Sequence, residues 1–537
     1  MSGTERTRLD AGAATATAAP DLMPTDGGAR SRANLGGLAR GGALSLIGSG
    51  LSALAGVLVV LVLTRALPPA AAGTFFAVTS VFLLGQAVAK LGTNVSLVYF
   101  ISRFRSLGVP ERIGVTLRSA FGPVAVASTL IGVATFAVAP WLAELVVGEP
   151  SSEATAAVRV LALLVPVAAV ADTAVSATRG FDTVRPTVVL DRIGRSGLQV
   201  VTVVVAVLLG WRTAGLLAAA WALPYLLPAV LGLRDLRRRH RAATEAGSGQ
   251  PVDTGVTTPP FWRFTWPRAL AGVAQIALQR LDIVLVAAML GPVSAAVYTA
   301  ASRVLVAGQL SNQAISNAVQ ARLGELLARD DVAAANTAYR ASTAWLVLLN
   351  WPLYLLLALF APMVLRVFGP EYDGGTSVVI ILSGAMLLAS ACGMVNLVLV
   401  TAGRTTWNLG NAVLALGINI AANLILIPVL GIAGAAIAWA LAIVVSNVVA
   451  LAQIYFTKGL HPFGRGTLIA MGLAVACFAV IPDVAVLLWG GAAATLLVAT
   501  AIGIAAYVAA CYRLRAPLAI DELRRRSGAR RGASAAR

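Results

Sequence analysis

Two opposite charges interrupt an apolar segment of the chain, AQIALQRLDIVLVAAMLGP at residues 274–292. Arg280 and Asp282 stand near its middle, where a charged side chain costs roughly 2.5–3.5 kcal/mol or more to insert into a membrane. Residues two apart are separated by about 200° around a helix, so these two side chains cannot share a face or pair with each other. Charges kept at this cost predict a polar passage through the protein, or buried partners on neighbouring helices.

One face of this helix carries a polar stripe. Within roughly 60° of each other, at about 100° per residue, lie Arg268, Gln275, Gln279 and Asp282. Such a stripe faces a wet cavity or other polar groups rather than lipid. The two glutamines therefore line a cavity or bond to a neighbouring helix, and Asp282 either couples an ion or forms a salt bridge. Arg280 points elsewhere, toward a substrate or toward the carboxylate of another helix.

The next apolar segment, 293–322, is more polar still. Arg303 lies roughly 15 Å in from its start, near the middle of a bilayer. The same segment also carries Gln309, Gln313 and Asn317, and Arg303 lies about 40° from Asn317 around the helix, within its polar arc. Arg303 is therefore expected either to contact a substrate or to form one half of a structural ion pair.

A third set of polar residues lies in the N-terminal part of the chain. Gln86, Lys90 and Asn94 follow one another at i, i+4 and i+8 within the segment 72–101. They line a cavity, unless Lys90 instead extends to the cytoplasmic interface. Asp172 is a candidate for ion coupling, although a bridge to a nearby arginine is the favoured expectation. Asp191 and Arg195, at i and i+4, are expected to pair.

Cationic groups in a low-dielectric cavity suit a diphosphate. Arginine gives forked, charge-assisted hydrogen bonds to phosphate oxygens and stays charged when desolvated. A glycan needs amide and hydroxyl partners, which glutamine and asparagine supply. The pattern therefore favours an anionic, sugar-bearing ligand over a cationic drug.

Several other chemistries are not indicated. The sequence contains no Gly-rich phosphate loop, HExxH or CxxC motif, and its three cysteines lie inside apolar segments without metal spacing. No cofactor or metal is expected, and the chain is not expected to be an enzyme. A net charge of +18 suggests nucleic acid in a soluble protein, but here the basic residues lie between apolar segments. No nucleic-acid partner is expected.

The composition sets the fold class. The chain has 537 residues, of which 58% are hydrophobic and 12% charged, whereas soluble domains are about one-quarter charged. Apolar segments of about twenty residues recur along it, each long enough to cross a bilayer. These features predict an all-α polytopic membrane protein with fourteen spans, near 41–66, 72–101, 114–140, 155–178, 187–210, 213–234, 263–290, 293–322, 341–366, 376–402, 406–428, 433–456, 465–482 and 485–511.

Arginines concentrate in every second connection between these spans, and by the positive-inside rule those connections and both termini are cytoplasmic. The predicted organisation is a disordered tail at 1–40, a six-helix bundle at 41–234, a basic linker at 235–260, a second six-helix bundle at 261–456, accessory helices at 457–511 and a basic tail at 512–537.

An internal repeat supports two related bundles. With a shift of 223 residues, Leu67-Pro68-Pro69 aligns with Leu290-Gly291-Pro292, Gly85-Gln86 with Gly308-Gln309, and Asn94 with Asn317. The first two spans and spans seven and eight thus share a register. Repeats of this kind commonly rock about a central site.

Four stretches carry a family resemblance: LTRALPPAAAGTFFAVTSVFLLGQAVAKLGT, QRLDIVLVAAMLGPVSAAVYTAASRV, FGPEYDGG and IPVLGIAGAAIAWA. The chain resembles the polysaccharide-flippase branch of the multidrug/oligosaccharidyl-lipid/polysaccharide exporter superfamily. The resemblance implies a V-shaped protein of two bundles that moves a lipid-linked glycan across the membrane, with spans 13 and 14 forming a groove for the polyprenyl tail. In the lipid II flippases of this superfamily a cavity arginine begins span 8, and YTAASR places Arg303 at that position.

The sequence thus predicts a flippase for a polyprenyl-diphosphate-linked oligosaccharide in the bacterial plasma membrane, where it serves envelope polysaccharide biosynthesis by alternating access. The expected partners are the lipid-linked glycan, the lipid bilayer, H⁺ or Na⁺ as coupling ion, and a polysaccharide polymerase or glycosyltransferases. The alternative is an ion-coupled multidrug exporter of the same superfamily.

Overall fold

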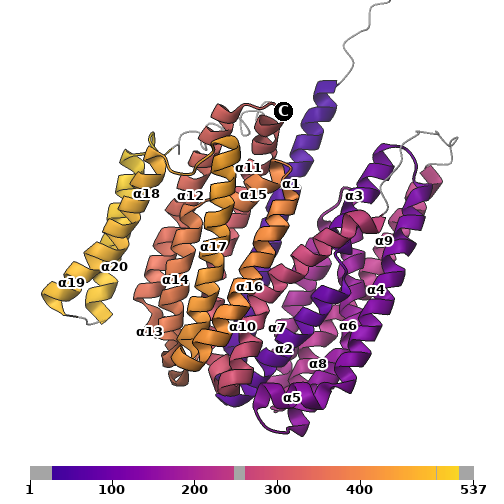
Figure 1. Ribbon diagram of the computed structural model, residues 1–537, viewed down its shortest axis with the longest axis horizontal. Coiled ribbons are helices and arrows are strands. Elements are labelled where there is room, and N and C mark those ends of the chain that lie inside the picture. The colour runs from indigo at the N-terminus through magenta and orange to yellow at the C-terminus, as the bar shows by residue number, and fades with distance from the viewer. Residues whose placement is uncertain (1–26, 247–260, 491–492, 519–537) are drawn as a thin grey trace, which may run out of the picture.

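The computed structural model of the protein describes residues 27–246, 261–490 and 493–518, and within these ranges all regular secondary structure is helical. Figure 1 shows long helices that run side by side. Within the described residues, twelve helical segments are long and apolar enough to cross a membrane. The chain is therefore an all-α, multi-pass membrane protein, as its composition predicts.

The twelve crossing helices account for most of the fourteen expected spans. Two expected spans are not among the twelve. The span at 187–210 is composite, a π-helix (η1, Thr187–Arg195) followed by α7 (Ser196–Leu208). The inner part of the span at 293–322 forms α11 (Ala307–Ala328), whose many polar residues lower its hydropathy. The count of fourteen is therefore approximate.

The helices of the N-terminal part are α1 (Gly27–Ala66), α2 (Pro69–Ala89), α3 (Thr93–Ser106), α4 (Glu111–Ala137), α5 (Ala139–Val147), α6 (Ser152–Arg179), η1 and α7, then α8 (Ala214–Ala222), the 3-10 turn η2 (Leu223–Tyr225) and α9 (Leu226–Ala246). Those of the C-terminal part are α10 (Phe261–Val304), α11, α12 (Val332–Leu359), α13 (Ala361–Arg366), η3 (Pro370–Gly375), α14 (Thr376–Ala391), α15 (Val395–Thr401), α16 (Thr405–Leu430), α17 (Ile432–Lys458), α18 (Arg465–Val475), η4 (Ala476–Val480), α19 (Ile481–Trp489) and α20 (Ala493–Arg513).

Some helical boundaries differ from the expected domain boundaries. Helix α1 begins at Gly27, so residues 27–40, expected to belong to a tail, are helical. Helix α9 continues to Ala246 through the RRRHR sequence of the expected linker, because arginine is a good helix former. The rest of the N-terminal tail (1–26), of the linker (247–260) and of the C-terminal tail (519–537) lies outside the described residues.

Two of the long helical segments are interrupted, one within a span and one at the turn between two expected spans. Helix α2 ends before Leu91 and Gly92, which have φ angles of 49° and 71°, and α3 then starts at Thr93. Helix α10 is kinked at Gly291, with φ 83° and ψ 171°, a conformation that only glycine adopts easily. The helix resumes at Pro292, as α2 begins at Pro69, so the two prolines aligned by the internal repeat occupy equivalent positions at helix starts.

The two hairpins that share this register pack directly against each other. A Cβ atom on Gly73 of α2 would overlap the carbonyl oxygen of Pro292, so only glycine allows this approach. Nearby, Arg65 at the end of α1 donates hydrogen bonds to the carbonyl oxygens of Val367, at 2.7 Å, and Arg366, at 3.1 Å. In Figure 1 the other N-terminal helices gather on one side of the molecule and the later helices on the other, with α1 and α10 between them.

Candidate functional site

A cavity of about 250 Å³ lies among α1, α2, α7, α8 and α10. We call it the N-chamber, because most of its wall comes from the N-terminal helices. Its apolar wall includes Phe75, Phe76 and Val60, and its charged lining residues are Arg195, Arg280 and Arg303. The lining thus combines apolar side chains with three guanidinium groups, one from η1 and two from α10.

A second, smaller cavity of about 150 Å³ adjoins it on the C-terminal side. This C-chamber is lined by Gln279, Asp282 and Gln309, together with apolar residues of α14. Arg280 and Arg303 line both chambers. The two arginines thus mark the boundary between an N-terminal and a C-terminal space.

Neither arginine is neutralised by a carboxylate. Within the described ranges no ion pair involves Arg280 or Arg303, so the expectation that Arg280 serves as the buried partner of a carboxylate is wrong. The Nε of Arg303 is buried without a hydrogen-bond acceptor. The first limb of α10, before the Gly291 kink, carries Arg280, and the last turn of the second limb carries Arg303. The kink thus turns the helix so that both guanidinium groups reach the same place.

Asp282 is buried and held by neutral groups. Its carboxylate accepts hydrogen bonds from the hydroxyl of Tyr298 and from the side-chain amide of Asn423, each at 3.0 Å. No salt bridge to it occurs among the described residues, so the salt-bridge alternative is wrong. The side-chain oxygens of Asn419 and Asn423 are buried there without hydrogen-bond donors. A carboxyl group and two amide oxygens without donors therefore share one buried place between α10 and α16.

Some polar residues of α10 and α11 line the C-chamber, and others lie on exposed surfaces of these helices. Gln279 and Gln309 line the C-chamber. Gln275, Gln313 and Asn317 are exposed and line neither chamber. Of these five polar residues, only Gln279 and Gln309 line the cavity that Arg280 and Arg303 also line.

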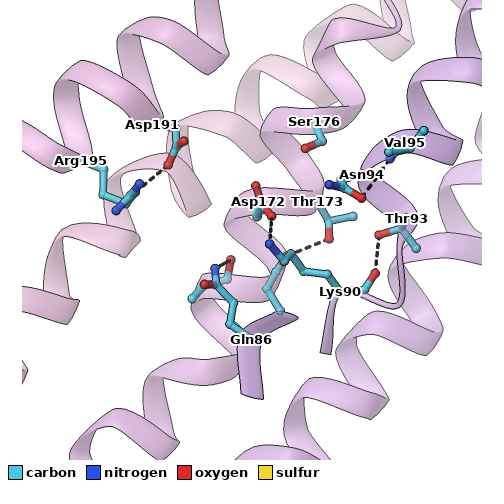
Figure 2. Close-up of polar contacts among 12 residues, drawn as sticks. Gln86, Lys90, Thr93, Asn94, Val95, Asp172, Thr173, Ser176, Asp191 and Arg195 are labelled. Carbon is cyan, nitrogen blue, oxygen red and sulfur yellow. Dashed lines mark hydrogen bonds and ion pairs between the residues drawn. The ribbon is translucent and has the colours of Figure 1, made fainter. Parts of the chain in front are cut away.

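The N-terminal set of predicted site residues lies apart from the chambers. Figure 2 shows Lys90 directed at Asp172, and their charged groups are 2.8 Å apart. The partner of Asp172 is thus Lys90 rather than the expected arginine, and Lys90 does not extend to the interface. Gln86 is buried and donates to the backbone oxygen of Ala168, at 3.2 Å. Asn94 accepts from the backbone of Val95 in the first turn of α3, at 3.1 Å. The contacts of Lys90 and Gln86 join α2 and its C-terminal end to α6, and that of Asn94 lies within α3.

Arg195 pairs with Asp191 as expected, at 2.6 Å. It also lines the N-chamber, which its sequence spacing did not indicate. Other lining residues that we did not predict are Ser52, Gln199, Trp221 and Tyr225. No single period along the sequence marks them as a set, because they come from three separate segments, α1, α7 and the α8–η2 region. Asn419 and Asn423 were also missed, although two asparagines at i and i+4 within an apolar span could have drawn notice.

Both the sequence and the fold of the chain are similar to those of known proteins. The family model described as "Polysaccharide biosynthesis protein" matches residues 38–320. Among solved structures, the chain is similar to the lipid II flippase MurJ in an inward closed conformation, with 14% identity and a TM-score of 0.67 over 87% of this chain and 98% of that one.

Two other solved structures share the fold. An inward-facing multidrug resistance MATE family transporter of the MOP superfamily has 18% identity and a TM-score of 0.57 over 76% of this chain and 94% of that one. A MOP superfamily transporter from Pyrococcus furiosus has 17% identity and a TM-score of 0.53 over 79% and 95%. At these identities the likeness shows the fold alone. No curated protein matches the chain.

Proposed function

Because the chain belongs to the polysaccharide biosynthesis protein family, as its sequence resemblance predicted, we propose that it flips a polyprenyl-diphosphate-linked oligosaccharide across the bacterial plasma membrane. The observation that carries this proposal is the pair of arginines, Arg280 and Arg303, on the shared wall of two chambers inside the membrane. The fold that the chain shares with a lipid II flippase supports it.

The physical argument concerns charge. A cation inside a membrane protein is costly unless an anion or a dipole compensates it. Arg280 and Arg303 lack a carboxylate partner in the described ranges, so the bound substrate is the group that completes them. A diphosphate offers several oxygens to two guanidinium forks. It therefore fits this wall better than a neutral ligand does.

The same wall disfavours the export of cationic drugs, the alternative function. A binding site for a cationic drug needs an accessible negative charge. The one carboxylate lining the two chambers, among the described residues, is Asp282, and both of its oxygens accept hydrogen bonds. A cationic ligand in the C-chamber would face the guanidinium groups of Arg280 and Arg303 beside this one carboxyl group.

Transport would proceed by alternating access between halves at 41–234 and 261–456, with the helices at 457–511 as an accessory pair. The close approach of Gly73 to Pro292 and the bonds from Arg65 to Val367 would seal the outer end. Opening that end requires these contacts to break while the opposite ends of the two halves approach each other.

Asp282 is the proposed ion-coupling residue. Hard cations prefer carboxylate and carbonyl oxygens, and Asp282 has the free amide oxygens of Asn419 and Asn423 beside it. This group of oxygens would bind Na⁺, or Asp282 alone would bind H⁺. Asp172 was also predicted to couple an ion, but its pair with Lys90 supplies a cation already, so the structure gives this role no support.

The experiment is reconstitution of the purified protein in liposomes with a fluorescent polyprenyl-diphosphate-linked sugar on one leaflet. Translocation would be followed by chemical quenching of the label from outside. The proposal expects translocation by the wild-type protein, its loss in Arg303→Ala, and no transport of a cationic dye. Transport of the dye without translocation of the lipid would establish the alternative.

A further inference from the structure

We infer that the N-chamber is a binding site for one sugar ring, the ring attached directly to the diphosphate. This inference rests on the proposed function and adds a second recognition element to it. The arginines would hold the charged group, and the N-chamber would distinguish a glycan-bearing lipid from the bare polyprenyl diphosphate.

The first support is a fixed aromatic surface. Trp221 lines the N-chamber, and three rings pack edge-on around its indole. Their centroids are 5.8 Å away for Phe82, 6.0 Å for Tyr225 and 6.3 Å for Phe75. A ring held on several sides keeps its orientation when the ligand arrives, which lowers the entropic cost of binding. The C–H face of a pyranose packs well on such a surface.

The second support is a set of donors suited to hydroxyl groups. The side-chain oxygens of Ser52 and Ser196 lie 2.9 Å apart on the wall of the N-chamber. The indole N–H of Trp221 makes no hydrogen bond to any described residue and is not a buried orphan. A sugar hydroxyl can both donate and accept, so it can insert into the serine pair and accept from the indole.

Arg195 contributes a further donor group in a fixed position. Its Nε is 2.6 Å from Asp191, its Nη1 donates to Gln199 at 3.0 Å, and its guanidinium carbon lies 4.7 Å from the ring centre of Tyr225. Because Asp191 already neutralises it, Arg195 does not need an anion as Arg280 and Arg303 do. A neutral, hydroxyl-rich group is the matching ligand for its remaining N–H groups.

The size and position of the N-chamber fit one ring. Its volume of about 250 Å³ is slightly below the lower end of ordinary small-molecule sites, about 300 Å³. The C-chamber is smaller, and the indole of its Trp439 already donates to the oxygen of Leu278 at 3.1 Å. A diphosphate at the boundary arginines would therefore place its first sugar in the N-chamber rather than in the C-chamber.

The test compares two probes on the full-length protein in nanodiscs. One is undecaprenyl diphosphate, and the other is the same lipid bearing a single N-acetylglucosamine on the diphosphate. Wild-type protein should bind the glycosylated probe more tightly. Trp221→Ala should weaken binding of the glycosylated probe about tenfold and leave that of the bare lipid unchanged. Trp221→Phe, which keeps an aromatic face, should recover part of the loss.

A second variant covers the case in which Trp221→Ala does not fold. Gly56 of α1 lines the N-chamber, and a Cβ atom added to it meets nothing within 4 Å. Gly56→Phe should therefore fill the N-chamber and exclude the glycosylated probe while the bare lipid still binds. Gly122→Phe, at an exposed glycine of α4 with equally open space, is the matched control and should bind both probes normally.

The outcomes separate the two proposals. If wild type binds both lipids equally, or if Gly56→Phe weakens both by the same factor or neither, the sugar site is refuted and diphosphate recognition stands. If wild type binds neither lipid, the proposed function fails and the sugar site fails with it.

Discussion

Replacement of Arg303 is the most direct perturbation of the proposed site. This arginine has no carboxylate partner within the described ranges, and its Nε is buried without an acceptor. Its removal therefore breaks no ion pair and relieves an uncompensated charge. Arg303→Ala should leave the melting temperature of the detergent-solubilised protein unchanged or slightly raised.

Arg303→Ala should instead weaken binding of the diphosphate-bearing lipid. A forked arginine gives two charge-assisted bonds to phosphate, each contributing about 1.5–3 kcal/mol. Loss of both corresponds to about 3–6 kcal/mol, a hundredfold to ten-thousandfold weaker affinity. Because Arg280 remains on the same wall, we expect the lower end of this range. Arg303→Lys keeps the charge and loses the fork, so about tenfold weaker binding is expected.

The assay has two parts. Affinity for undecaprenyl diphosphate is measured in nanodiscs, and accumulation of the lipid-linked glycan on the inner leaflet is measured in cells that carry each variant. Arg159→Ala is the control, since this arginine of α6 is exposed and lines neither chamber. Normal glycan export by Arg303→Ala, or a large drop in its melting temperature, would refute the reasoning and make Arg303 a structural residue.

Three further expectations concern two other charged residues and the membrane topology. Asp282→Asn should leave protein levels intact but remove the dependence of transport on Na⁺ or pH, and a collapse of protein levels would instead show a structural role. Lys90→Ala should lower the free energy of unfolding by about 1–3 kcal/mol, because it leaves Asp172 unpaired in a half-buried place. In thermal melting, the double variant Lys90→Ala/Asp172→Ala should be closer to wild type than the single variant. Reporters fused after residue 240 and after the C-terminal RRRSGARRG should report the cytoplasm, and one at Glu149 the outside; an exterior signal at 240 would contradict the two-half arrangement.

The fold class was predictable because it depends on local sequence pattern. Apolar length and the positions of arginines require no knowledge of which helices touch. Helical geometry alone also predicted that Arg280 and Asp282 do not pair with each other, and in the structure Asp282 is bound by Tyr298 and Asn423 instead.

Partner identity was not predictable, because it depends on tertiary contacts. Lys90 and Gln86 share a face in sequence, yet α6 lies against that face and takes both side chains away from any chamber. Trp221 of α8 and Ser52 of α1 both line the N-chamber, and only the tertiary arrangement of these helices brings them to one cavity. The Gly291 kink was visible as a Gly-Pro pair, but not its consequence, which is to bring Arg303 beside Arg280.

The placement of the two opposite charges on α10 provides a physical route for coupling within the proposed function. Arg280 lines both chambers, whereas Asp282 lines the C-chamber alone and is bound by Asn423 of α16. A rigid helix that carries both groups transmits a shift at one to the other, without any contact between the ligands. If ion binding at Asp282 favours the helix position that presents Arg280 and Arg303, then substrate must favour ion binding by the same factor. Titration of undecaprenyl diphosphate with and without Na⁺, and of Na⁺ with and without the lipid, should therefore give equal ratios of affinity, and Asp282→Asn should reduce both ratios to one. Unequal ratios, or ratios that persist in Asp282→Asn, would mean that the coupling runs through another element of the protein.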